Sequence, residues 1–273
     1  MKKNIVMVLL MLIMLFVLSA CSIYKSDGKR IKQMSRDSVE EYRIAWGGSW
    51  GRPSPFEIIP RGPGFVRMQL VYDSLVWKDK DGNIIPQLAK KWQYDEENFQ
   101  YLFELNEGVK WHDGEDFSAD DVVFTIEYIK AHKLPWLDLE IVKEAKVINE
   151  NQVVVSLENH YSPFMNIIAS GMPIIPKHIF ENVENPYNSE ALISCVGCGP
   201  YIFKDYSVEH GSYDFEGFEG YYNSNVMVNN IRFLSMNPEI LHLALIRDEV
   251  DLIMPSHESL EELIDEGLNV KKR

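Results

Sequence analysis

GVKWHDGEDFSADDVVF, residues 108–124, combines a tight turn with the start of a helix. Asp113 and Gly114 predict the turn, because an aspartate side chain accepts hydrogen bonds from the backbone that follows it and glycine allows a positive φ. Ser118 is followed three residues later by Asp121, and this spacing is typical of a capping box at a helix N-terminus. The stretch therefore predicts a turn that leads into an amphipathic helix.

The flanking segments alternate between strand and helix signals. Apolar residues alternate over 99–105, which predicts a strand with one buried face. Residues 86–92 (PQLAKKW) begin with a proline, which suits the first turn of a short helix. Residues 65–73 (FVRMQLVYD) also predict a helix, whereas 145–148 and 153–157 predict a hairpin.

The second half of the chain continues with short elements of both kinds. We expect strands at 42–46, 201–206, 213–218 and 230–234, and a helix at 238–249 that leads into a strand. Mixed short elements in this order predict an α/β fold built from mixed α+β lobes.

The N-terminus has the pattern of an export signal. Lys2 and Lys3 precede fourteen uninterrupted apolar residues at 5–18, and small residues lead directly to Cys21. The apolar run is shorter than the roughly 20 residues of a membrane-spanning helix and matches a signal-peptide core. We therefore interpret residues 1–20 as a lipoprotein signal peptide and Cys21 as a lipidated N-terminus; the alternative is an uncleaved membrane anchor.

The charge of the chain excludes some partners. Without residues 1–20 it carries 25 Lys and Arg against 41 Asp and Glu, a net charge of −16. Nucleic acid requires a basic surface, so no nucleic-acid partner is expected. A polybasic attachment to anionic lipid is excluded on the same ground, which leaves the lipid at Cys21 as the contact with the membrane.

Cys195 and Cys198 form a C-x-x-C pair whose state the sequence leaves open. Outside the cytoplasm such a pair is a candidate disulfide. The alternatives are two unligated small residues, or two ligands of a metal that would need two more Cys or His residues. No diagnostic His spacing accompanies the pair, so no metal site is predicted.

Catalytic signatures are missing from the sequence. The pair His112-Asp113 is interpreted as part of the turn, because no HExxH motif or nucleophile elbow accompanies it. The nearby acidic residues lack the residue order of a calcium loop, and a solvated face explains them. The protein is therefore not expected to be an enzyme, and no cofactor is expected.

Six blocks of sequence occur in an order that is known from one protein family. They are LVYDSLV (70–76), IPQLAKKW (85–92), GVKWHDG (108–114), SADDVVF (118–124), GCGPY (197–201) and ALIRDEVD (244–251). In these blocks the chain resembles the extracellular solute-binding proteins of the peptide and nickel class, family 5, which are the receptors of ABC importers. Asp248 and Cys198 depart from the glycine and threonine that this family favours.

The resemblance implies a periplasmic-binding-protein-like class II fold. Family members are much longer, so the far lobe would be largely missing and the sequence C-terminally truncated. The implied organisation is a signal peptide (1–20), a flexible tether (21–41), a first segment of lobe I (42–70), an inserted subdomain (71–190) and a second segment of lobe I (191–273).

The resemblance also implies a ligand cleft at the end of the first strand. Glycines there would let a peptide backbone approach, tryptophans would supply apolar contact, and arginines would bind a carboxylate. The alternative is that the glycines only turn the strand and the tryptophans belong to the core. The candidate ligand-binding residues are Trp46, Gly48, Ser49, Trp50, Arg52 and Arg61.

The function that these inferences predict is capture of oligopeptides outside the cytoplasmic membrane and delivery to ABC permease subunits. The protein would be lipid-anchored to the outer face of that membrane. Two alternatives stay open: a receptor of the same family for nickel or a metal chelate, and a truncated lipoprotein without a transport function.

Overall fold

The computed structural model describes residues 39–187, 195–224 and 226–255, together with positions 260, 263–265 and 267. The predicted signal peptide, Cys21 and most of the predicted tether lie outside these residues. The described residues belong to one compact unit. Within them, no helix has both the length and the apolar character needed to cross a membrane.

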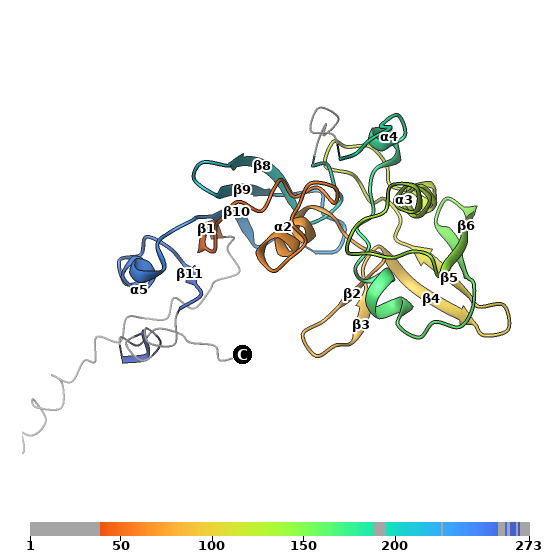
Figure 1. Cartoon of the computed structure of the whole chain (residues 1–273), viewed down its shortest axis with the longest axis horizontal. Helices are drawn as coiled ribbons and strands as arrows, with labels where there is room; N and C mark the ends of the chain where they lie inside the picture. The colour runs from red at the N-terminus through yellow and green to blue at the C-terminus, as the bar shows by residue number, and fades with distance from the viewer. Residues whose placement is uncertain are drawn as a thin grey trace, which may run out of the picture. The chain divides into compact units, whose positions relative to one another are not determined.

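A five-stranded mixed sheet joins the beginning and the end of the described chain (Figure 1). Its strand order is β11-β1-β10-β9-β8. β1 (Val39–Ala45) runs parallel to β10 (Val228–Phe233) and to β11 (Leu252–Ile253). β9 (Ser212–Gly217) is antiparallel both to β10 and to β8 (Tyr201–Ser207). The chain between β1 and β10 therefore forms one long crossover connection.

A second, antiparallel sheet lies within this crossover. Its order is β4 (Ala89–Asp95), β5 (Gln100–Leu105), β7 (Gln152–Leu157) and β6 (Val142–Asn149). Helix α3 (Ala119–His132) packs against β6 and β7. The predicted strand at 99–105 and the predicted hairpin correspond to β5 and to β6–β7, and are confirmed.

The remaining elements are short. They are α2 (Pro63–Val71), the paired strands β2 (Val76–Lys78) and β3 (Ile84–Pro86), η1 (Met165–Ala169), α4 (Lys177–Phe180), η2 (Pro238–Ile240) and α5 (Leu241–Ile246). α2 confirms the helix predicted at 65–73. The helix predicted at 238–249 is shorter than expected and begins with the 3-10 turn η2. The strand predicted from residue 42 begins earlier, at Val39.

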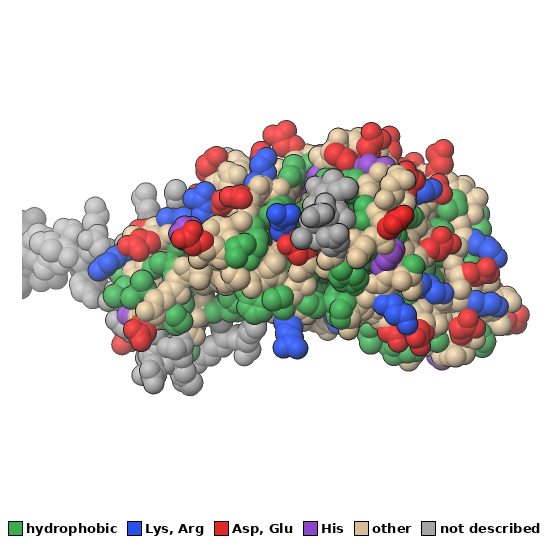
Figure 2. Space-filling view, turned by 45° about the horizontal axis from the view of Figure 1, so that its top comes forward, with side chains coloured by type: hydrophobic (Ala, Val, Ile, Leu, Met, Phe, Trp, Pro, Cys, Tyr) green, Lys and Arg blue, Asp and Glu red, His purple; other side chains and the backbone are tan. Residues whose placement is uncertain are grey.

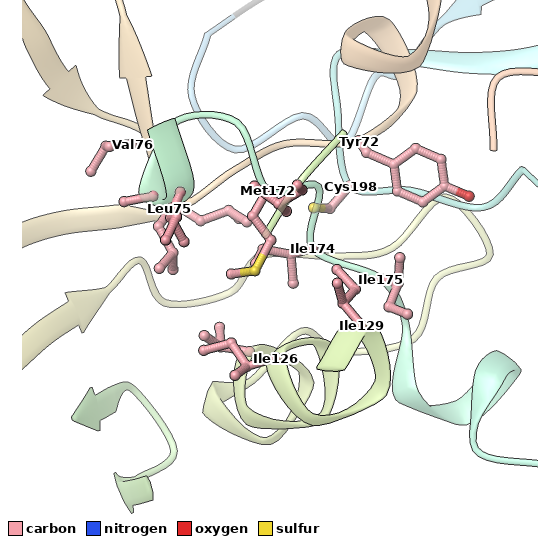
Figure 3. Packing of buried hydrophobic residues seen from close by; sticks show 14 of the residues in the cluster. Tyr72, Leu75, Val76, Ile126, Ile129, Met172, Ile174, Ile175 and Cys198 are labelled. Atoms are coloured by element: carbon pink, nitrogen blue, oxygen red, sulfur yellow. The ribbon is translucent and has the colours of Figure 1, made fainter. Parts of the chain in front are cut away.

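A large cluster of buried apolar side chains connects the two sheets, with Phe103 of β5 and Phe215 of β9 both belonging to it. Ile126 and Ile129 of α3 face the segment that carries Ile174 (Figure 3). Ile126 and Ile129 are buried, as the apolar face of the predicted helix requires.

The short helix predicted at residues 86–92 is wrong. Pro86 ends β3, and the residues from Ala89 onward form β4, in which Trp92 pairs with Phe103 of β5. Burial along β4 alternates residue by residue, as it does in a strand with one buried face. Pairing with β5 thus outweighs the local preference of a proline followed by helix-forming residues.

The turn and the capping box predicted at 113–121 are confirmed. The Asp113 carboxylate accepts a hydrogen bond from the Glu115 backbone N–H at 3.2 Å, and Gly114 has a φ of 94°. Asp121 accepts from the backbone N–H of Ser118 at 2.9 Å, and the Ser118 hydroxyl caps the first turn of α3 in return. Asp113, Glu115, Asp116 and Asp120 are exposed, as a solvated face requires. Figure 2 shows acidic and basic side chains interspersed over one face of the molecule.

His112 connects the turn before α3 to the segment that precedes β8. Its Nε2–H donates to the carbonyl oxygen of Gly199 at 2.9 Å, and its Nδ1 accepts from the N–H of Gly197 at 3.3 Å. The His112 N–H donates to the Gly197 carbonyl oxygen at 2.9 Å. These contacts require a neutral ring, and burial lowers the pKa of His112 to about 4.

The division of the chain into 42–70, 71–190 and 191–273 stays a prediction. The large mixed sheet does combine β1 with strands that follow residue 200, and the antiparallel sheet lies between them in sequence. That arrangement is the one from which a lobe with an insertion would be built.

The pH dependence of stability tests the role of His112. Because its pKa is lowered in the folded state, the unfolded chain binds the proton first as the pH falls from 6.5 to 4. The contribution of His112 to the free energy of unfolding is therefore fully present above pH 6.5. It falls by about 3 kcal/mol as the pH is lowered toward 4. Urea unfolding of the wild type and of His112→Asn at both pH values should show this loss in the wild type alone. Equal losses in the two proteins would contradict the assignment.

Candidate functional site

The six candidate ligand-binding residues lie on one loop between β1 and α2. Four of them are within residues 46–50, directly after β1. The other two, Arg52 and Arg61, lie farther along, before α2. The structure thus places the candidates on a single connection, and the contacts of that connection decide which of their atoms are available to a ligand.

The backbone amides of Gly47 and Gly48 are hydrogen-bonded to residues that adjoin β10 and β9. The Gly47 N–H donates to the carbonyl oxygen of Leu234 at 2.8 Å, and the Gly48 N–H donates to that of Gly211 at 2.8 Å. These donors are satisfied within the protein. A ligand would therefore meet the side chains of this loop rather than its glycine amides.

The two glycines are required by the packing of the loop itself. A Cβ at Gly47 would lie 2.2 Å from the backbone nitrogen of Ser235, and Gly48 has a φ of 117° that other residues rarely adopt. These observations favour the interpretation that the glycines turn the strand. The close approach of a ligand backbone stays a prediction.

The side chains of the loop differ in exposure. Trp46 and Trp50 are half-buried and pack against the main core cluster. The exposed Ser49 donates its hydroxyl hydrogen to the carbonyl oxygen of Val208 at 3.1 Å. Arg52 and Arg61 are exposed, and within the described residues neither guanidinium pairs with a carboxylate.

Arg67 holds the start of this loop, and sequence analysis missed it. The side chain is fully buried, and its Nη2 donates to the carbonyl oxygen of Trp46. The guanidinium carbon lies 4.3 Å from the ring centre of Tyr213 and 4.6 Å from that of Phe233. Burial without a carboxylate partner lowers its pKa to about 10, so the group stays charged at neutral pH. A signal was present, because Arg67 lies on the apolar face of α2 with Met68.

Tyr213 of β9 holds the other end of the loop. Its hydroxyl accepts a hydrogen bond from the Trp50 N–H at 2.9 Å and donates to the carbonyl oxygen of Gly51 at 3.0 Å. The tyrosine ring is fully buried and stacks on Tyr206 at 4.4 Å. The sequence indicated only a strand here, because which backbone groups the hydroxyl reaches depends on the sheet order.

A groove of about 600 Å³ runs along the outer face of α2, and we call it the α2 groove. Its aromatic walls are Phe65, Trp77 and Trp136. Phe65 and Trp136 pack edge to face, with ring centres 5.5 Å apart. The complete lining is Pro60, Gly62, Phe65, Gln69, Trp77, Lys78, Trp136, Leu137, Asn166, Ile167, Ser170 and Gly171.

The α2 groove combines apolar walls with a few polar groups. The Trp136 Nε1–H is buried and has no hydrogen-bond partner among the described residues. Ile167 is half exposed, and Lys78 is the one charged residue among the described residues that line the groove. Such a mixture suits an organic ligand with apolar groups and hydrogen-bond acceptors.

Cys195 and Cys198 are both free cysteines in the structure, so the candidate disulfide is not formed there. Burial raises the pKa of the Cys195 thiol to about 12 and raises that of Cys198 as well. Protonated, buried thiols are poor metal ligands. In the part of the chain that the structure describes, no three His, Cys, Asp or Glu residues are grouped as a metal site requires.

Comparisons with known proteins identify the family of the chain. Residues 83–272 match the family described as "Bacterial extracellular solute-binding proteins, family 5 Middle". The dipeptide-binding protein of Escherichia coli is 27% identical over 192 residues, which cover 62% of this chain and 36% of that protein. The oligopeptide-binding protein AppA of Bacillus subtilis is 26% identical over 244 residues, which cover 85% of this chain and 44% of that protein.

A solved structure extends the likeness to the fold. NikZ from Campylobacter jejuni, crystallised with Ni(L-His), superposes with a TM-score of 0.70 at 25% identity, covering 85% of this chain and 46% of that one. The mixed α/β fold of a periplasmic binding protein is thereby confirmed. The chain spans less than half the length of these three proteins.

The chain belongs to the bacterial extracellular solute-binding proteins of family 5. The resemblance seen in the six sequence blocks is confirmed. Membership also confirms the expectation of a binding protein rather than an enzyme, and the family as described consists of extracellular proteins.

Removal of the Tyr213 hydroxyl should loosen the loop at residues 46–51. In Tyr213→Phe the Trp50 N–H and the Gly51 carbonyl both lose their partner, which should lower the free energy of unfolding by about 1–3 kcal/mol. Tyr201→Phe is the control, because the Tyr201 hydroxyl makes no hydrogen bond to the described residues and the change should cost less than 0.5 kcal/mol, roughly. Urea titration measures both, and equal effects would contradict the anchoring role.

Proposed function

We propose that this protein is the solute-binding lipoprotein of an ABC importer and captures oligopeptides in the α2 groove. The observation that carries the proposal is the groove itself, with Phe65, Trp77 and Trp136 around a space of about 600 Å³. Membership of a solute-binding family supports it, and so do the printed names of relatives that bind dipeptides and oligopeptides.

The groove offers what an extended peptide needs. Its aromatic and aliphatic walls accept apolar side chains of different shapes, because contact with a ring face is not specific for one residue. Gln69 and Asn166 line the groove and carry amide groups. These groups match the alternating donors and acceptors of a peptide backbone.

The loop of candidate residues meets the groove at one point. Arg61 lies between Pro60 and Gly62, both of which line the groove. We propose that its guanidinium binds the ligand carboxylate. Trp46, Gly48, Ser49, Trp50 and Arg52 are proposed to contact the other end of a longer ligand.

Transport would follow from closure around the ligand. Relatives are more than twice as long as the matched region, and we propose that a second wall of the cleft comes from the corresponding part of a longer protein. A ligand that contacts both walls stabilises the closed state. The closed form would then deliver the peptide to ABC permease subunits.

The proposed location is the outer face of the cytoplasmic membrane, with a lipid on Cys21. The apolar run that ends at this cysteine supports the proposal. The net charge of the mature chain argues against electrostatic attachment to anionic lipid. Two or more acyl chains are enough for stable anchoring.

A metal chelate is the alternative ligand, and the nickel–histidine complex bound to NikZ favours it. The described residues contain no grouped metal ligands, so a metal would have to arrive as a chelate whose organic part fits the groove. The other alternative, a lipoprotein without a transport function, requires that no peptide binds at all.

Substitution of Trp136 tests the groove. In Trp136→Ala the groove loses an aromatic wall, so affinity for di- to hexapeptides should fall about tenfold or more. Intrinsic fluorescence or calorimetry of the full chain measures the affinity. Trp92→Ala, a half-buried tryptophan of β4 outside the groove, is the matched control and should bind as the wild type does.

Three other results would change the proposal. Equal losses in the two variants would remove the groove as the site. Binding of nickel–histidine without peptide binding would favour the chelate alternative. Absence of binding to every peptide and chelate would leave a lipoprotein without a transport function.

Metabolic labelling with palmitate tests the anchor. The wild type should carry the label and be recovered with membranes, whereas Cys21→Ser should be unlabelled, because diacylglycerol requires the thiol. The intact mass of the labelled product should correspond to an acylated chain whose first residue is Cys21. An unlabelled wild type that begins at Met1 would instead show an uncleaved anchor.

A further inference from the structure

The C-x-x-C pair of Cys195 and Cys198 has no part in the proposed function. Cys198 is fully buried and Cys195 is half-buried, and both are free thiols. The motif overlaps residues 197–199, which we call the docking segment. Because the two cysteines stand at the ends of the motif, a bond between them acts directly on this segment.

Tyr72 lies near both thiols. Its side chain is 3% exposed, and its hydroxyl group has no hydrogen-bond partner among the described residues. Burial raises the pKa of Tyr72, and electrostatic interaction with Cys195 and Cys198 raises it further, so both sulfur atoms lie within reach of this one hydroxyl group. Tyr72 and Cys198 belong to the same buried cluster (Figure 3).

The backbone between the two cysteines has the wrong shape for a disulfide. A disulfide holds its two Cα atoms within about 7 Å, and four residues that span so short a distance form a turn. The chain, however, neither turns nor bends at residues 195–197. The thiol form in the structure and a Cys195–Cys198 disulfide therefore require different backbone conformations.

Gly197 lies inside the ring that this disulfide would close, and its contacts fix it in place. Its N–H donates to His112 Nδ1 at 3.3 Å, and its carbonyl oxygen accepts from the His112 N–H at 2.9 Å. A Cβ at this position would lie 1.9 Å from the carbonyl oxygen of Val71. Gly197 cannot turn without the loss of these contacts.

We propose that Cys195 and Cys198 form a redox switch, in which oxidation to a disulfide releases the docking segment from α2 and His112. The oxidant is a disulfide RSSR of low molecular mass, and the family as described is extracellular, where disulfides persist. The two cysteines lose two protons and two electrons, and RSSR takes them up as two thiols RSH.

The order of the two steps follows from burial. Cys195 lies outside the docking segment and is half-buried, so its thiolate attacks RSSR first, forms Cys195–S–S–R and expels RS⁻. The Cys198 thiolate then attacks the Cys195 sulfur and expels the second RS⁻, and for this step the motif has to turn. Burial raises the pKa of Cys195 to about 12 and also raises that of Cys198, so both steps are slow at neutral pH.

Release of the docking segment would also affect the α2 groove. The Gly199 N–H donates to the carbonyl oxygen of Val71, the last residue of α2, and α2 carries Phe65 of the groove wall. Weaker peptide binding by the oxidised form rests on the proposed function. The disulfide and the release of the segment do not rest on it, so the two proposals fail separately.

The test uses the full chain with Cys21→Ser, which leaves Cys195 and Cys198 as its two thiols. Incubation of the folded protein with oxidised glutathione should give a product about 2 Da lighter by intact mass. In that product the His112 and Gly199 amides should exchange with solvent at least tenfold, roughly, faster than in the reduced protein, whereas the amides of β5 should be unchanged. Dithiothreitol should reverse both changes.

Cys198→Ser is the matched control. It keeps Cys195, so it should stop at the glutathione adduct and retain slow exchange at His112 and Gly199; if it does not fold, the wild-type comparison still decides. A folded wild type that forms no disulfide, under conditions in which the urea-unfolded chain does, overturns the proposal. A disulfide that leaves the two amides as slow as before overturns it as well. Equal peptide affinity of the two redox forms, with the faster exchange present, supports the switch and removes only its effect on the groove.

Discussion

The docking of residues 197–199 between the end of α2 and His112 is the contact on which the rest of the described structure depends. The Gly199 N–H donates to the carbonyl oxygen of Val71 at 2.8 Å, and a Cβ at Gly197 would lie 1.9 Å from the same oxygen. Only glycine permits this approach. Because His112 holds the other side of the segment, the chain that enters β8 is fixed both to α2 and to the turn that precedes α3.

The two faces of α2 explain how one short helix can serve both fold and binding. Its inner face carries Arg67, which fixes the loop after β1 through the carbonyl oxygen of Trp46. Its outer face contributes Phe65 to the α2 groove. Any shift of α2 against the docking segment would therefore move the loop and the groove together.

Local sequence signals predicted much of the fold. The capping box at Ser118 and the turn at Asp113 were readable because their partners lie within a few residues. β4 was not, because its pairing partner is a neighbouring strand and Pro86 suggested a helix start. Arg67 was missed for a similar reason: its environment is made by residues distant in the chain, and it follows no motif.

Native-state hydrogen exchange of the His112 and Gly199 amides tests the central claim most directly. Both N–H groups are donors in the docking contact. If that contact fixes residues 197–199 to α2 and to His112, the two amides should exchange only through global unfolding. Their exchange should then be as slow as that of the amides at the centre of β5. Exchange as fast as that of the exposed turn at Gly82 would show that the segment opens independently, and would contradict the account.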